Sequence, residues 1–80
     1  MKVIVTIMPK NGVLDPQGKA IAHALGTLGF EGVNDVRAGK VIELELQETD
    51  PNRAKAQAED MARKLLANEV IESFRVEVGL

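Results

Sequence analysis

Apolar positions recur with two different spacings along the chain. Short segments that are apolar at every second position, or apolar throughout, predict strands over about residues 3–8, 41–47 and 71–78. A fourth strand is expected over about residues 33–38, from their position between Gly32 and the turn at residues 37–40. Longer segments with apolar residues every three or four positions predict two helices. The first runs from about Pro16 to Leu28, and the second from Pro51 to about Asn68.

Both predicted helices begin with the dipeptide Asp-Pro. Asp15 and Asp50 are the expected N-caps, because a carboxylate can accept from the free N–H groups of the first turn. Pro16 and Pro51 suit the first helical position, where the missing N–H costs nothing. Gly29 is placed to end the first helix in a left-handed turn. The stripes expected to be buried are Ala20, Ile21, Ala24, Leu25 and Leu28 in the first helix, and Ala54, Ala58, Met61, Ala62, Leu65 and Leu66 in the second.

The element order βαββαβ favours a ferredoxin-like α+β two-layer sandwich, with two helices on one face of an antiparallel four-stranded sheet. The second and third strands would be joined by a tight hairpin at residues 37–40, with Gly39 able to take positive φ. Strand 3–8 is apolar on both faces, with Ile4 and Met8 opposite the core side. A strand of this kind is covered on both faces. Since the two helices cover one face of the sheet, a second chain is expected to cover the other face and to contact Ile4, Met8 and Val41.

Composition adds limits to this picture. The 80 residues predict a single domain over 1–80, too small to bury more than about 60–65% of its unfolded surface. The chain has no Cys, so no disulfide compensates, and oligomerisation is the natural remedy. A formal net charge of -2 gives no electrostatic reason to expect nucleic acid. No stretch has the pattern of a signal peptide or membrane span, which predicts a cytoplasmic protein without membrane contact.

Candidate catalytic patterns are incomplete. Gly12 and Gly18-Lys19 depart from a phosphate-binding loop in spacing, and Ala20 replaces the hydroxyl residue that would hold magnesium. His23 has no neighbouring partner for a metal site or a nucleophile, so a surface or interface position is expected. Glu43 and Glu45 share a strand face, where solvated charge explains them more simply than acid–base chemistry. We therefore predict no catalytic, cofactor-binding or metal-binding residue in this chain.

The chain resembles the PurS family, the small subunits of phosphoribosylformylglycinamidine synthase. The resemblance is most specific in the run Gly12-Val13-Leu14-Asp15-Pro16-Gln17-Gly18-Lys19-Ala20. It continues in Leu28-Gly29-Phe30 and Val36-Arg37-Ala38-Gly39-Lys40 and covers essentially the whole chain.

This resemblance implies a non-catalytic adaptor in de novo purine biosynthesis. It would bridge a PurQ-type glutaminase and a PurL-type synthase subunit, so that ammonia from glutamine reaches formylglycinamide ribonucleotide. The complex would use ATP, magnesium and glutamine, none of them bound by this chain. The family also implies a homodimer or a dimer of dimers that packs through its sheets.

Polar side chains on turns or at a helix start are the expected contacts with these subunits, because they can reach another protein. They are Lys10, Asn11, Lys19, Arg37 and Lys40. Two other classes of protein remain open: an ACT-like regulatory module that binds a small molecule near the first strand–helix loop, and a purely structural oligomer. Thermal stabilisation by amino acids or nucleotides would distinguish the first of these from an adaptor.

Overall fold

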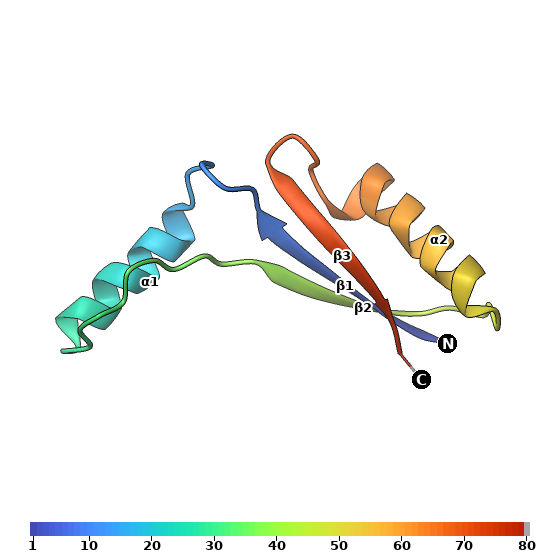
Figure 1. The fold of residues 1–80 in the computed structure, drawn as a ribbon, viewed down its shortest axis with the longest axis horizontal. Coiled ribbons are helices and arrows are strands. Elements are labelled where there is room, and N and C mark those ends of the chain that lie inside the picture. Colours follow the sequence, from blue (N-terminus) through green and yellow to red (C-terminus); the bar gives the residue numbers. More distant parts are fainter. Residues whose placement is uncertain (80) are drawn as a thin grey trace.

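The computed structural model describes residues 1–79 as three strands and two helices (Figure 1). Their order is β1 (Lys2–Pro9), α1 (Pro16–Thr27), β2 (Lys40–Glu45), α2 (Pro51–Met61) and β3 (Glu72–Val78), with a π-helical segment η1 (Ala62–Leu66) continuing α2. The strands form one antiparallel sheet in the order β2-β1-β3. The α+β class is confirmed. The four-stranded ferredoxin-like sheet is wrong, because residues 33–38 form no strand and the order is βαβαβ.

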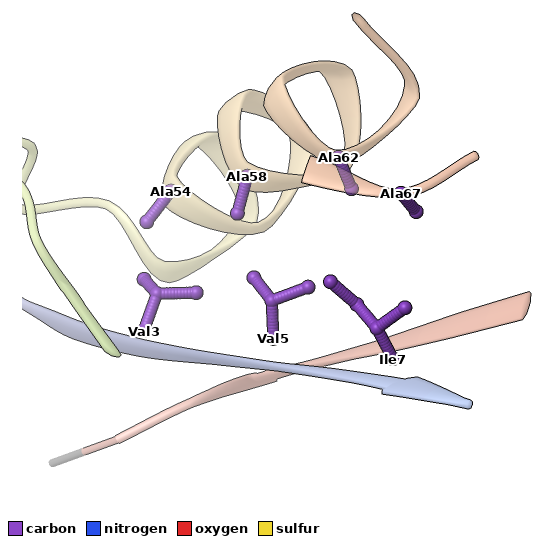
Figure 2. Packing of buried hydrophobic residues seen from close by; sticks show 7 residues of the cluster. All are labelled: Val3, Val5, Ile7, Ala54, Ala58, Ala62 and Ala67. Atoms are coloured by element: carbon purple, nitrogen blue, oxygen red, sulfur yellow. The ribbon is translucent and has the colours of Figure 1, made fainter. Parts of the chain in front are cut away.

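The core lies between α2 and one face of the sheet, called the inner face. Val3, Val5 and Ile7 of β1 are fully buried there, as the alternation of the strand predicts. Figure 2 shows them pointing toward four alanines: Ala54, Ala58, Ala62 and Ala67. Because an alanine side chain is a single methyl group, the helix approaches the sheet closely, and the branched side chains of β1 fill the space between them.

The end of the second helix differs from the prediction. The α-helical part stops at Met61, and η1 closes with a bond from the Ala67 N–H to the Ala62 carbonyl at 2.9 Å. A π-helical turn holds one residue more than an α-helical turn, which shifts the side chains that follow. Leu65 within this segment is accordingly 83% exposed. Met61, which precedes it, is 37% exposed, so neither residue belongs to the buried stripe that was predicted.

The first helix does not cover the sheet. In Figure 1, α1 and the extended segment 28–39 project together from one end of the sheet, away from α2; we call residues 16–39 the arm. Of the residues of α1, Gly18 alone is buried. The predicted buried stripe of α1 is therefore wrong for the described chain: Leu25 is half-buried, whereas Ala20, Ile21, Ala24 and Leu28 are exposed. The helix does end as predicted, with Gly29 at a φ of 93°.

The predicted hairpin at residues 37–40 is replaced by a straight connection into β2. Gly39 does not take positive φ, which in residues 1–79 occurs at Gly12, Gly29 and Gly32. Val33 and Val36 are an odd number of positions apart, so in a strand they would lie on opposite faces and build no apolar side. Because the segment has no apolar side, it would bury little apolar surface by folding back against the chain's own sheet.

The overall shape is elongated as a result. The radius of gyration is 15.8 Å, with principal extents of 48 × 27 × 15 Å. A compact domain of this length has a radius of gyration of about 12 Å. The arm therefore lies outside the single packed core, and its position decides which surfaces the molecule offers to partners.

Candidate functional site

Asp15 lies where the arm joins the sheet and binds two separate parts of the chain. Its Oδ1 accepts from the Gly18 N–H at 2.9 Å, which caps α1, and its Oδ2 accepts from the Ala38 N–H at 2.8 Å. These two backbone donors, with a smaller contribution from the charge of Arg37, hold the pKa of the Asp15 carboxyl below its usual value. Pro16 occupies the first helical turn behind this cap.

Two glycines pack at the same junction without room for a side chain. A Cβ on Gly18 would meet the Val36 carbonyl oxygen and the Asp15 carboxylate. A Cβ on Gly39 would meet the Ile7 carbonyl oxygen and the Met8 sulfur. Together with Asp15, these contacts fasten α1 to the extended segment and the segment to the end of β1. The sequence does not predict either contact; its one visible signal is a glycine within the first turn of α1, a position that does not require it.

The five residues predicted to dock partners are all exposed, and they lie in the segments of the chain that meet at or lead into this junction. Lys10 follows the end of β1, and its backbone N–H donates to the Ile71 carbonyl at 2.8 Å. Asn11 is next along the same turn. Lys19 is adjacent to Gly18, Arg37 lies between Val36 and Ala38, and Lys40 begins β2 opposite Ile7. The contacts of Asp15, Gly18 and Gly39 thus bring together the stretches of backbone on either side of these residues, which the sequence leaves as two separate turns.

The three residues predicted for the oligomer interface lie on the outer face of the sheet, opposite α2. Ile4 and Met8 of β1 are half-buried, and Val41 of β2 is 64% exposed. Two ion pairs lie on the same face: Lys2 Nζ is 3.5 Å from Glu43 Oε1, and Arg75 Nε is 2.8 Å from Glu77 Oε1. The outer face is therefore an apolar strip bordered by ion pairs of both signs, a pattern that suits contact with another protein.

The remaining candidate groups occupy ordinary surface positions. Glu43 pairs with Lys2, and Glu45 accepts from the Met1 amino group at 3.0 Å, which matches solvated edge charges. His23 is exposed on α1. At the second cap, Asp50 accepts from the Asn52 N–H at 2.9 Å, with Pro51 opening α2.

Residues 1–79 contain no group of three acidic, histidine or cysteine side chains arranged to hold a metal ion, and no pocket. No helix in this part of the chain is both long and apolar enough to cross a bilayer.

These features define a class of protein: a small α+β subunit with exposed apolar and cationic surfaces. The family described as "PurS: Phosphoribosylformylglycinamidine (FGAM) synthase" matches residues 2–79. The PurS subunit of this synthase from Bacillus subtilis is 46% identical over 77 residues, which cover 96% of this chain and 90% of the relative. That from Methanocaldococcus jannaschii is 39% identical, with coverages of 96% and 93%.

Solved structures agree with this match. A crystal form of Bacillus subtilis PurS has a TM-score of 0.86 at 44% identity, with 99% of this chain and 98% of that chain covered. A chain in the structure of PurLQS from Thermotoga maritima has a TM-score of 0.85 at 28% identity, with coverages of 95% and 93%. The chain belongs to the PurS family, as its sequence motifs indicated. It is a subunit of phosphoribosylformylglycinamidine synthase, an enzyme of purine biosynthesis.

Proposed function

We propose that this chain is the non-catalytic adaptor of its synthase, bridging a PurL-type synthase and a PurQ-type glutaminase in the cytoplasm. Glutamine-derived ammonia would pass between these two subunits to formylglycinamide ribonucleotide. The observation that carries the proposal is the likeness to a chain of the PurLQS structure from Thermotoga maritima, at a TM-score of 0.85. The exposed cationic side chains around Asp15 give the adaptor a surface on which another subunit can dock.

The docking surface is the junction formed by Lys10, Asn11, Lys19, Arg37 and Lys40. Lys19, Arg37 and Lys40 lie next to the contacts of Asp15, Gly18 and Gly39, and the Lys10 N–H donates to the Ile71 carbonyl, so the backbone that carries these residues is held before a partner arrives. Arginine and lysine side chains at such a site can bind carboxylates or carbonyls of a facing subunit, with arginine able to make two parallel hydrogen bonds. The excess of cations predicts an acidic facing surface.

The experiment replaces Lys10 or Arg37 with Glu and assays both partners with glutamine, at a limiting concentration of the variant. We expect each change to lower the glutamine-dependent rate at least several-fold, because charge reversal at a docking site opposes association. The ammonia-dependent rate of the synthase should stay near that of the wild type. Lys55→Glu, an exposed change on α2 distant from the junction in Figure 1, is the matched control. Full glutamine-dependent rates with both variants would exclude this surface.

We also propose that the chain itself binds no cofactor, and that ATP, magnesium and glutamine bind the other subunits. Ligands that bind a folded protein raise its Tm by mass action. The Tm of the isolated chain should therefore be unchanged by ATP with magnesium, by glutamine and by other amino acids at millimolar concentrations. A rise of several degrees with any of them would instead favour an ACT-like regulatory module.

Self-association completes the proposal. Two copies would stack through their outer sheet faces, burying Ile4, Met8 and Val41, as part of a homodimer or a dimer of dimers. Burial of one such side chain contributes about 1.5–3 kcal/mol, so several together can hold two copies in contact.

A further inference from the structure

The loop that joins β1 to α1 begins with a tight turn at residues 10–13 (Figure 1). The Val13 N–H donates to the Lys10 carbonyl at 3.2 Å, and Gly12, the third residue of the turn, has a φ of 83°. These are the features of a type II turn, which needs a positive φ at its third residue and therefore favours glycine there. Asn11 holds the second position. The turn thus explains Gly12, whereas it does not require an asparagine before it.

An asparagine followed by a glycine carries two groups that can react with each other. The backbone nitrogen of the glycine can attack the side-chain carbonyl carbon of the asparagine and close a succinimide ring. A Cβ on the second residue would crowd this approach, and glycine has none. The surroundings of Gly12 are open as well, because a Cβ built there would meet nothing within 4 Å. Ring closure between Asn11 and Gly12 therefore meets no steric obstacle.

Hydrogen bonds do not hold these two groups apart. Within residues 1–79, neither the Asn11 carboxamide nor the Gly12 N–H has a hydrogen-bond partner, and Asn11 is exposed. The turn itself is closed by one bond of 3.2 Å, which is long for a bond from N–H to oxygen. Breaking that one bond frees the Gly12 peptide to rotate toward the Asn11 side chain.

The other asparagines of the chain lack this combination. They are Asn34, Asn52 and Asn68, and each is followed by a residue that has a Cβ. Asn52 is further restrained within the first turn of α2, and the Asn68 side chain accepts a hydrogen bond from the Val70 N–H at 3.1 Å. Because they experience the same solution as Asn11, they serve as internal references for its reactivity.

We propose that Asn11 is a modification site, at which reaction with the Gly12 nitrogen and then with water converts the side-chain amide to a carboxylate. In the first step the Gly12 nitrogen bonds to the Asn11 Cγ, the bond from Cγ to Nδ2 breaks, and Nδ2 leaves as ammonia with the Gly12 proton. In the second step water adds to a ring carbonyl carbon, and the bond from that carbon to the Gly12 nitrogen breaks. Opening at Cγ gives aspartate. Opening at the main-chain carbonyl gives isoaspartate, in which the chain continues through the former side chain.

The modification changes the proposed docking surface. Asn11 follows Lys10 on that surface, whose cations are expected to face an acidic partner. A carboxylate at this position opposes such a partner by like-charge repulsion. The isoaspartate form also adds a methylene to the main chain of the turn, which moves the Val13 N–H relative to the Lys10 carbonyl. This consequence rests on the proposed function, whereas the reaction itself depends on the chain alone.

The reaction is tested on the isolated chain, which is incubated at mildly alkaline pH and then digested in acid, where ring closure is slow. Mass spectrometry should show that the peptide with Asn11 gains the mass difference between an acid and an amide, well before the peptides with Asn34, Asn52 or Asn68 do. An isoaspartyl methyltransferase should label the same peptide. Asn11→Gln retains an amide on a longer side chain and should resist conversion. Conversion of Asn11 no faster than that of Asn34 would overturn the proposal.

The consequence is tested in the glutamine-dependent assay, with both partner subunits and a limiting concentration of this chain. We expect the incubated wild type to lose rate several-fold in proportion to its conversion, and fresh Asn11→Asp to show a similar loss. Incubated Asn11→Gln should keep the rate of the fresh variant. Asn34→Asp adds the same charge at an exposed residue outside the docking surface and is the matched control.

The two measurements separate the possible failures. A fully converted chain with an unchanged rate would show that position 11 does not face a partner, and the consequence for docking would be wrong. An unconverted Asn11 would overturn the modification and leave the adaptor role intact. Failure of the fresh wild type to support glutamine-dependent synthesis would contradict the adaptor role, while mass spectrometry would still decide the fate of Asn11.

Discussion

Asp15 is the residue on which the arrangement of the arm depends most. It caps α1 and binds the Ala38 N–H, 23 residues further along the chain, with the two oxygens of one carboxylate. The sequence predicts the cap, because Asp before Pro at a helix start is a local signal. It cannot predict the second bond, since nothing near Ala38 indicates which acceptor its N–H will meet.

The depressed pKa of Asp15 makes this contribution dependent on pH. A carboxyl whose folded pKa lies below the unfolded value, about 3.9, stabilises the fold fully above that value. The contribution is lost as the pH falls through the lower folded pKa. The variant Asp15→Asn keeps the shape of the side chain but replaces one acceptor oxygen with a donor. At neutral pH we expect its Tm to lie roughly 5 °C below that of the wild type.

Thermal melts at several pH values check this expectation. The difference in Tm between wild type and Asp15→Asn should be constant above about pH 5 and should shrink as the pH falls below about 4. Asp35→Asn, at an exposed acidic residue of the same extended segment, is the control and should show a much smaller difference at neutral pH. Equal Tm values for wild type and Asp15→Asn at pH 7 would contradict the role assigned to this carboxylate.

At the scale of elements, periodicity and capping residues predict an element correctly where residues close together in the sequence determine it. The Asp-Pro starts of α1 and α2, the buried side of β1 and the left-handed Gly29 all follow from nearby residues. Residues 33–38 were assigned to a strand from their position between a helix and a turn, although their valines do not alternate. Whether such a segment pairs depends on which strand edge it meets, and that information lies outside the segment.

Two glycines within α1 offer a matched test of how closely this helix approaches the extended segment. Alanine favours a helix over glycine by about 0.5–1 kcal/mol, so Gly26→Ala, which meets nothing within 4 Å, should stabilise the protein by about that amount. Gly18→Ala has the same propensity gain, but its Cβ collides with the Val36 carbonyl and the Asp15 carboxylate. We expect it to destabilise the protein by about 1–3 kcal/mol, as overpacking does.

Urea denaturation of the two variants, with the midpoint compared at constant slope, measures both effects. Opposite signs for Gly18→Ala and Gly26→Ala would support a fixed contact between α1 and residues 36–38. Stabilisation by both substitutions would mean that the helix moves freely relative to the segment, and the account of the junction would then be wrong.

At the scale of the whole molecule, the sequence predicts that the chain has too little core but not which surfaces compensate. Eighty residues without Cys, and a β1 apolar on both faces, indicate partners. The pattern of α1 also predicts burial, and a periodic pattern contains no information on whether the cover comes from the same chain. The docking residues illustrate a similar limit, because the loop at residues 9–14 and the straight connection at residues 37–40 meet at one junction only through the contacts of Asp15 and Gly39.

The outer sheet face can be tested as an interface at Ile4, on its central strand. Ile4 lies on β1, the central strand, opposite Glu43 on one side and Glu77 on the other. If two copies stack there, Ile4→Lys places a charge in the contact, and removing this charge from water costs more than the lost apolar contact even with Glu43 and Glu77 beside it. The variant should have half the mass of the wild type by light scattering at micromolar concentration. Ile4→Val retains an apolar side chain and should keep the full mass. If Ile4→Lys folds, as judged by circular dichroism, and keeps the full mass, the outer face is not an interface between copies and remains open to the other subunits of the synthase.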